Sequence, residues 1–243
     1  MMPSEKKITR ENALDIIKQF AKEYRRELGK AVGEIIFVGG GSIMLNYKFR
    51  DATQDFDVIL KTASGVKDVI AKFADDNDLP RDWMNSDFVK TESYSDMLSE
   101  VSKHFCTLNN GTLEIRTVSG VYLIAMKIRA RRDYRNDISD AIGILIEERE
   151  AERNITFNDI ESAYNKLYND SIPTDLRGKL QEICNMDFDA LKDYYEKRFQ
   201  NEREIGETVV QYIEEGANIN VRNVAEVIKR IKEKADMKQE NSD

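Results

Sequence analysis

Two aspartates, Asp55 and Asp57, flank one aromatic residue and precede the apolar run from Val58 to Leu60. This pattern predicts a β-strand, on which side chains two residues apart point to the same face. Both carboxylates would then point one way, while Phe56 points into the core. Two carboxylates on one face repel each other unless a cation lies between them, and hard oxygen ligands suit Mg²⁺ or Mn²⁺. We therefore expect Asp55 and Asp57 to be catalytic metal ligands.

A glycine-rich turn lies upstream of the aspartates. The apolar run from Ile35 to Val38 leads directly into Gly39, Gly40, Gly41 and Ser42. We interpret this stretch as a strand, a glycine turn and a short helix, followed by a connector to the strand of the aspartates. Free backbone N–H groups at a helix start bind phosphate, so Gly40, Gly41 and Ser42 are predicted to hold nucleotide phosphates. Either feature alone has a simple alternative, a packing turn or a chance Asp-x-Asp pair, and their combination is more specific.

The combination resembles the motif of the polymerase-β-like nucleotidyltransferase superfamily, through Gly41-Ser42, the spacer 43–54 and the two aspartates. More narrowly, the stretch resembles AbiEii-type toxins and DUF6036-type nucleotidyltransferase-like proteins, in which an Arg and a Thr often precede the aspartates, here Arg50 and Thr53. The resemblance covers about residues 30–145. It implies an NTP substrate, an acceptor RNA or protein, and a toxin–antitoxin or phage-defence setting with an antitoxin partner.

A basic stretch, residues 119–133, predicts a second helix of interest. This stretch resembles a pattern of AbiEii-type proteins, in which an apolar helix start is followed by a lysine and later by paired aspartates. Lys127, Asp137 and Asp140 match that pattern here. The resemblance implies that Lys127 meets the triphosphate, and a lysine beside carboxylates and metal can neutralise developing phosphate charge. The alternatives are a solvated basic helix face and, for Arg131 with Asp137, a structural ion pair.

A β-hairpin is predicted where the short runs 103–107 and 112–118 flank an Asn-Asn-Gly turn. Superfamily members often carry a third carboxylate on a strand after the Asp-x-Asp strand, and Glu114 is the acidic residue of the second run. We expect Glu114 to complete the catalytic metal site, with a surface residue paired across the strand as the alternative. His104, the sole histidine, is expected at a sheet edge rather than in the site.

The predicted fold class is α+β, a small mixed sheet flanked by helices followed by a mainly helical C-terminal region. We place the nucleotidyltransferase-like domain at residues 1–150 and the helical region at 151–243. Helices are predicted over 9–28, which Thr9 can cap, and from Gly65 to about Asp76. Thr156 is predicted to start another helix, with Asp159 completing a capping box, and further helices are predicted over the following ranges: 174–184, 187–216 and 220–236. No catalytic motif follows residue 150, so this half would bind the acceptor, a partner or a second copy of the chain.

The composition excludes several classes of protein. Of the 243 residues 41% are hydrophobic and 34% are charged, and no apolar run is long enough to cross a bilayer. The polar N-terminus lacks the apolar region of a signal peptide, and two distant cysteines indicate free thiols in a reducing cytoplasm. A net charge of −8 argues against broad nonspecific binding to nucleic acid.

The leading functional hypothesis is a metal-dependent nucleotidyltransferase that moves NMP from NTP to an acceptor hydroxyl. The first alternative is a noncatalytic nucleotide-binding module on the same fold, since the third carboxylate is uncertain. The second is a protein-interaction scaffold that works through its C-terminal helices.

Overall fold

The structure is a computed structural model that describes residues 7–132, 136–214 and 226–227. A five-stranded mixed sheet has the strand order β5-β4-β2-β7-β6. Its strands are β2 (Gly33–Phe37), β4 (Phe56–Lys61), β5 (Met84–Asn85), β6 (Ser102–Leu108) and β7 (Leu113–Val118). The central strand β2 pairs antiparallel with β4 and parallel with β7. A separate ribbon pairs β1 (Ile8–Thr9) with β3 (Ala52–Thr53).

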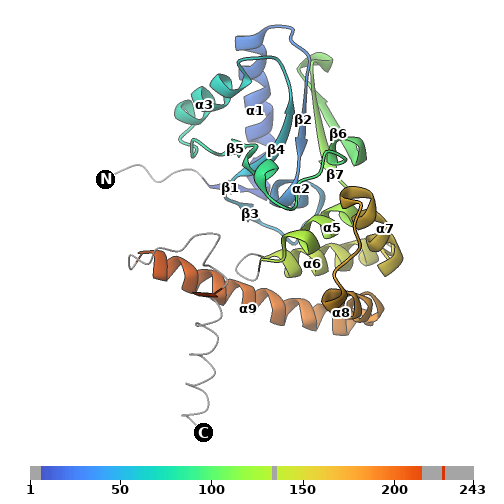
Figure 1. Ribbon diagram of the computed structural model, residues 1–243. Helices are drawn as coiled ribbons and strands as arrows, with labels where there is room; N and C mark the ends of the chain where they lie inside the picture. The colour runs from blue at the N-terminus through green and yellow to red at the C-terminus, as the bar shows by residue number, and fades with distance from the viewer. Residues whose placement is uncertain (1–6, 133–135, 215–225, 228–243) are drawn as a thin grey trace.

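One face of the sheet is covered by α1 (Arg10–Leu28) and α3 (Val66–Asp76), which lie beside it in Figure 1. The sequence predicts both helices, including the cap of α1, where the Thr9 backbone N–H donates to Asn12 Oδ1 at 2.8 Å. Trp83 is fully buried in this core and donates from Nε1 to the Ile70 carbonyl oxygen at 3.2 Å. The tryptophan therefore has a packing role.

The other helical elements in this part of the chain are α2 (Gly39–Asn46), which follows β2, and three short ones. These are η1 (Asp87–Lys90), α4 (Leu98–Val101) and η2 (Asn109–Gly111), the last of which joins β6 to β7. The antiparallel β6–β7 pair confirms the predicted hairpin. His104 lies in β6 at the edge of the sheet.

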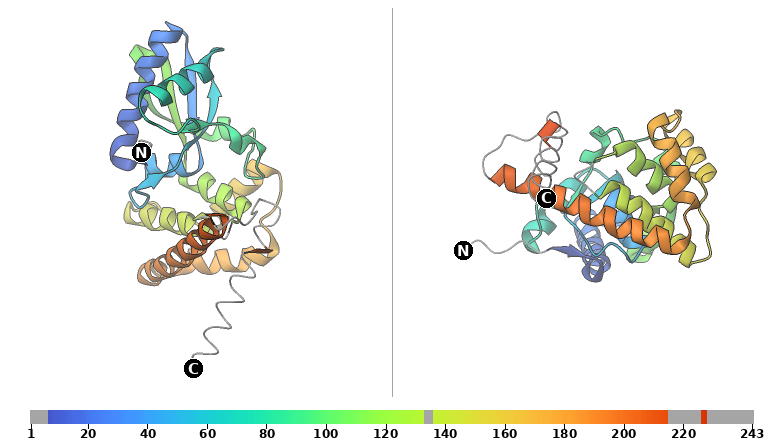
Figure 2. Two further views of the ribbon diagram at one scale, coloured as in Figure 1. Left: turned by 90° about the vertical axis from the view of Figure 1, so that its left-hand side faces the viewer. Right: turned by 90° about the horizontal axis from the view of Figure 1, so that it is seen from below.

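Five helices lie below the sheet in Figure 1: α5 (Gly120–Ala130), α6 (Asp137–Glu150), α7 (Phe157–Tyr168), α8 (Thr174–Asn185) and α9 (Phe188–Glu214). Seen from below, α9 runs across this layer, and it contacts α6 (Figure 2). Thr156 caps α7 with Asp159 as predicted, by accepting the Asp159 N–H at 3.2 Å. The helix predicted over 220–236 lies almost entirely outside the described residues.

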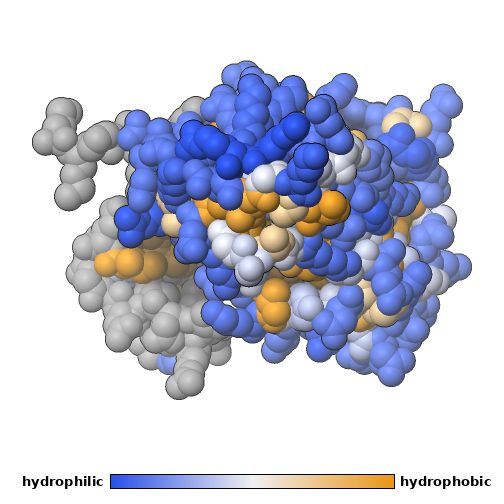
Figure 3. Space-filling view, turned by 90° about the horizontal axis from the view of Figure 1, so that it is seen from above, coloured by the Kyte–Doolittle hydropathy of each residue, from blue (hydrophilic) through white to orange (hydrophobic). Residues whose placement is uncertain are grey.

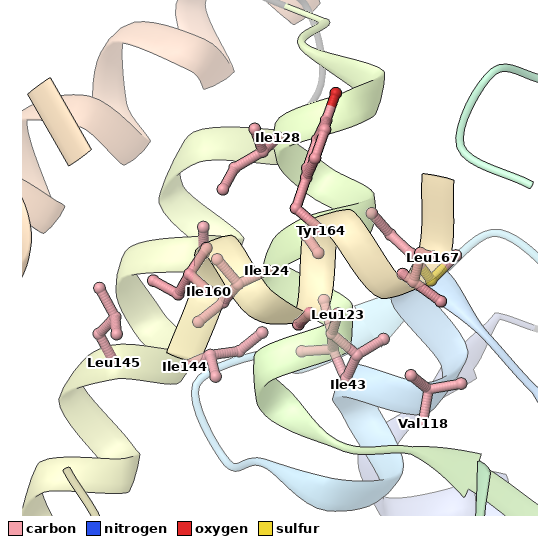
Figure 4. Close-up of a cluster of buried hydrophobic side chains, with 14 of the residues drawn as sticks. Ile43, Val118, Leu123, Ile124, Ile128, Ile144, Leu145, Ile160, Tyr164 and Leu167 are labelled. Atoms are coloured by element: carbon pink, nitrogen blue, oxygen red, sulfur yellow. The ribbon is translucent and has the colours of Figure 1, made fainter. Parts of the chain in front are cut away.

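The second core joins these helices to the other face of the sheet. Side chains of α2, β7, α5, α6 and α7 interlock in it (Figure 4). The labelled members are Ile43, Val118, Leu123, Ile124, Ile128, Ile144, Leu145, Ile160, Tyr164 and Leu167. The helices after residue 150 therefore share one hydrophobic core with α5, α6 and the sheet.

The surface agrees with the charged composition. Seen from above, it is largely hydrophilic, with apolar side chains gathered mainly near the centre of the view (Figure 3). None of the helices in the described part of the chain combines the length and apolarity needed to cross a membrane.

Candidate active site

The two aspartates lie at the start of β4. Asp57 is the second residue of this strand and Asp55 precedes the strand by one residue. Both side chains are half-buried, while Phe56 between them is fully buried in the first core. The burial follows the alternation expected from the sequence, because a strand sends successive side chains to opposite faces.

The Asp57 carboxylate lies against the first turn of α2. The Val38 backbone N–H donates to the Asp57 carbonyl oxygen at 2.9 Å, which joins the end of β2 to the start of β4. A Cβ atom placed on Gly39 would be 3.3 Å from Asp57 Oδ2. The glycine turn therefore lies beside Asp57 of the Asp-x-Asp pair, although twelve residues, 43–54, separate the turn from the pair in sequence.

Asn85 fixes the orientation of Asp55. It is the residue of β5 in register with Asp57, and its Nδ2 donates to Asp55 Oδ2 at 2.8 Å. Nδ2 also donates to the Asp82 carbonyl oxygen, and Oδ1 accepts the backbone N–H of Asp87 at 2.9 Å. Since both ends of the amide have partners, Asn85 holds the Asp55 carboxylate in one orientation, beside the strand pair that contains Asp57.

The first turn of α2 offers backbone donors beside these carboxylates. The first three N–H groups of an α-helix lack intrahelical acceptors, and here they belong to Gly39, Gly40 and Gly41. Val38, the N-cap residue, has no side chain that could accept them. Gly39 has a φ of 52°, which a residue with a Cβ rarely adopts. The turn therefore combines free donors with the positive end of the helix dipole.

Ser42 has a different environment from the one predicted. Its side chain is fully buried, and its Oγ accepts the Val118 backbone N–H at 2.9 Å. The hydroxyl also lies 3.3 Å from the Val118 carbonyl oxygen. The Ser42 side chain therefore joins α2 to the end of β7 and does not reach the surface of the glycine turn.

Glu114 does not join the two aspartates. It is in register with Glu34 near the start of β2, whereas Asp57 lies opposite Val38, just past the other end of β2. Four residues along the strand separate these levels, about 13 Å. Arg116 donates to Glu114 at 2.8 Å, and this hydrogen bond lowers the pKa of the Glu114 carboxyl. The expectation that Glu114 completes the metal site is corrected by this register, which is set by sheet pairing rather than local sequence.

Lys127 is enclosed by carboxylates. Its Nζ lies 2.9 Å from Asp137 Oδ1 and 2.7 Å from Asp140 Oδ2, and all three side chains are buried. Burial favours the neutral form of Asp137, but the charges and hydrogen bonds of Lys127 and Arg132 hold the pKa of this carboxyl well below its ordinary value. One alternative drawn from the sequence was a structural ion pair between Arg131 and Asp137. In the structure, Arg131 pairs instead with Asp175, at 2.5 Å.

Arg50 connects the Lys127 cluster to the glycine turn. Its Nη1 donates to Asp140 Oδ2 at 2.5 Å, and its Nη2 would be 2.8 Å from a Cβ atom on Gly40. Lys127 is therefore connected to the turn only indirectly, through the carboxylate of Asp140 and the guanidinium of Arg50. Neither spacing nor periodicity indicates this arrangement, because Arg50 and Asp140 are ninety residues apart.

The residues present fit a divalent cation held jointly with a nucleotide. Within the described ranges, no group of three or more His, Cys, Asp and Glu side chains is placed to hold a metal. Mg²⁺, however, is commonly bound by one or two carboxylates together with substrate phosphates, rather than by an all-protein cage. Asp57 supplies one such carboxylate beside the glycine turn, and Asp55, two residues earlier in the chain, supplies a second.

Comparison with family models matches residues 12–183 to the DUF6036 family, described as a nucleotidyltransferase of unknown function. The chain belongs to the DUF6036 family. The match includes the glycine turn, both aspartates and Lys127, and it extends through α7 and most of α8. Comparisons with curated proteins and with solved structures found no match. The DUF6036 assignment agrees with the α+β fold and with the resemblance drawn from the Gly-Ser and Asp-x-Asp motif.

Proposed function

We propose that this DUF6036 protein is a metal-dependent nucleotidyltransferase that moves NMP from an NTP to an acceptor hydroxyl. The observation that carries the proposal is the position of the Asp57 carboxylate, beside the open first turn of α2. Such a turn suits the phosphates of a nucleotide, and an adjacent carboxylate pair suits the cation that accompanies them. Packing of the core does not require a carboxylate such as Asp57 at a helix N-terminus. Nor does it require a second carboxylate, Asp55, whose orientation is set by the Asn85 amide.

The chain's own residues would bind and orient the donor nucleotide. The N–H groups of Gly39, Gly40 and Gly41 would hold phosphate oxygens, and Asn85 would keep Asp55 in place. Asp55 and Asp57 would hold Mg²⁺ or Mn²⁺, which supplies charge neutralisation at the phosphates and activation of the acceptor oxygen. In the reaction, the acceptor oxygen bonds to the α-phosphorus, the bond to the β-phosphate breaks, and pyrophosphate and a proton are released.

The resemblance to AbiEii-type toxins supports a further part of the proposal, a toxin or phage-defence setting. The acceptor would then be an RNA or a protein, and an antitoxin partner would neutralise the enzyme in the cytoplasm. The helices after residue 150 would bind the acceptor, the antitoxin or a second copy of the chain.

A noncatalytic nucleotide-binding module is the second candidate. It is favoured by the position of Glu114, which leaves two carboxylates rather than three near the glycine turn within the described residues. Both candidates require metal-dependent nucleotide binding, and only the first requires transfer.

Calorimetric titration of the protein with each NTP, with and without Mg²⁺ or Mn²⁺, tests the shared requirement. We expect metal-dependent binding by the wild type and its loss in the Asp55→Asn/Asp57→Asn double variant. Labelled α-phosphate appearing on RNA or protein would then distinguish transfer from binding alone. If both folded proteins bind no nucleotide, the site assignment is wrong and the scaffold hypothesis becomes the stronger one.

A further inference from the structure

Arg50 has one engaged and one unengaged edge. Its Nη1 donates to Asp140 at 2.5 Å, whereas its Nε is buried and has no hydrogen-bond partner. A guanidinium is planar and presents Nε–H and Nη2–H side by side, in the fork that matches two oxygens of a phosphate. A buried donor without an acceptor is costly, so an acceptor from a ligand is expected at this edge.

The position of the unengaged edge indicates which ligand would supply that acceptor. A Cβ atom on Gly40 would lie 2.8 Å from Nη2 of Arg50 and 3.0 Å from Cζ, so the guanidinium lies directly against the backbone of the turn. The same turn carries the N–H groups at the start of α2, which have no acceptor within the helix. A guanidinium edge, helix N–H donors and the positive end of the helix dipole thus lie close together at this turn.

We propose that Arg50 binds a phosphate of the nucleotide through its Nε–Nη2 edge, together with the N–H groups of the glycine turn. This inference rests on the proposed function and adds the residue that recognises the triphosphate. It gives Lys127 a different role from the one implied by the family resemblance. Lys127 is a positioning residue, which acts through Asp140 rather than on the phosphate.

The path from Lys127 to the phosphate consists of buried contacts. Asp140 lies between Lys127 Nζ, at 2.7 Å, and Arg50 Nη1, at 2.5 Å, and its side chain is only 4% exposed. The first turn of α6, which carries Asp140, is itself held by Glu202 of α9, whose Oε2 accepts the Ser139 hydroxyl at 2.6 Å. Asp140 is therefore immobilised from two sides and fixes the Arg50 side chain against the turn.

The alternative is that Arg50 is only a structural partner of Asp140. The two accounts differ in the property that a substitution changes. A structural ion pair supports stability and leaves phosphate affinity unchanged, whereas a phosphate ligand supports affinity. Because Asp140 keeps Lys127 as a partner when Arg50 is replaced, Arg50→Gln should remain folded.

The test is calorimetric titration of the full chain with pyrophosphate and with ATP, in the presence of Mg²⁺. We expect Arg50→Gln to lose about 10- to 100-fold in affinity for both. Arg50→Lys should fall between, because a point charge replaces the fork. Arg116→Gln is the matched control, since Arg116 is 22% exposed against 21% for Arg50 and bonds Glu114 and Ser102 away from the turn. Its affinity should equal that of the wild type.

The positioning role of Asp140 is tested by a double-mutant cycle. Asp140→Asn should weaken pyrophosphate binding in the wild-type background and have little further effect in the Arg50→Gln background. Independent losses in the two variants would contradict the role of Asp140.

Two results would overturn the role of Arg50, and only one of them would also overturn the proposed function. If Arg50→Gln and Arg50→Lys bind pyrophosphate as the wild type does, while Asp57→Asn loses metal-dependent ATP binding, Arg50 is only structural and the proposed function stands. If the wild type binds neither ligand, both the role of Arg50 and the proposed function are wrong.

Discussion

Asp57 Oδ2 lies 3.3 Å from the position that a Cβ atom of Gly39 would occupy, so the carboxylate and the helix N-terminus share one locus. The helix dipole stabilises this carboxylate, but a phosphate bound at the same turn would repel it. A divalent cation between the carboxylate and the phosphate removes this conflict. For the proposed nucleotide site, this relationship leads us to expect that nucleotide binding depends on metal.

Asp57→Asn should abolish metal-dependent nucleotide binding and leave the fold intact. The carboxamide keeps the size of the side chain but is a much weaker cation ligand. We expect the free energy of unfolding to change by no more than about 1 kcal/mol, the scale of a charge at a helix N-terminus. Chemical denaturation and calorimetry on the same sample measure both quantities. An unfolded variant would mean that Asp57 is a structural residue.

Alanine at two neighbouring glycines should affect different properties. A Cβ on Gly41 would be 2.7 Å from Cδ1 of the buried Phe56 ring, so Gly41→Ala should lower the free energy of unfolding by about 1–3 kcal/mol. A Cβ on Gly40 would meet the guanidinium of Arg50 instead, the far end of a long side chain, which can shift at the cost of its contacts with Asp140 and the turn. Gly40→Ala should therefore reduce nucleotide affinity with a smaller loss of stability. Equal stability losses in the two variants would contradict this distinction.

Lys127→Met should destabilise the fold. The substitution keeps an unbranched side chain of similar length and leaves the buried Asp137 and Asp140 without their shared ammonium group. Breaking a buried ion pair by removing one partner typically costs about 3–5 kcal/mol. Urea denaturation measures the loss, with Lys192→Met as the control, because Lys192 pairs with Glu150 at a half-exposed position. Wild-type stability with reduced nucleotide affinity would instead place Lys127 on the phosphate.

The pH dependence of stability should reflect Asp137. Lys127 and Arg132 outweigh burial and hold its pKa in the folded protein below the ordinary value of 3.8. A depressed pKa means that the carboxylate stabilises the fold above about pH 3.8, and that this contribution is lost as pH falls below that value. The stability difference between wild type and Asp137→Asn should therefore shrink below pH 3.8. A difference that stays constant from pH 7 to pH 3 would show that Asp137 is not held in this way.

Local patterns were sufficient to predict much of the fold. The capped helix α1, the β6–β7 hairpin and the capping box of α7 all depend on contacts between residues close in sequence. Such contacts are encoded by residue type and spacing, because short segments have few alternative ways to satisfy their backbone. The helix predicted over 220–236 is almost entirely beyond the described residues.

The register of the sheet and the partners of charged side chains could not be predicted in this way. Glu114 has the residue type of a third metal ligand, but the pairing of β7 with β2 places it at the other end of the sheet. Lys127 has the type of a phosphate ligand, but α6 folds back on α5 and encloses it with two aspartates. Both outcomes depend on segments that meet only in the folded chain.

The sequence by itself determined that Asp55 and Asp57 share a face and that a glycine turn precedes them, because strand alternation and glycine conformation are local properties. Only the tertiary structure decided which groups meet at that turn. It brings Asp57 to Gly39, Asn85 to Asp55, and Arg50 between Gly40 and Asp140. The physical reason is that hydrophobic burial on both faces of the sheet sets how these elements pack, and burial depends on surface area rather than on sequence order.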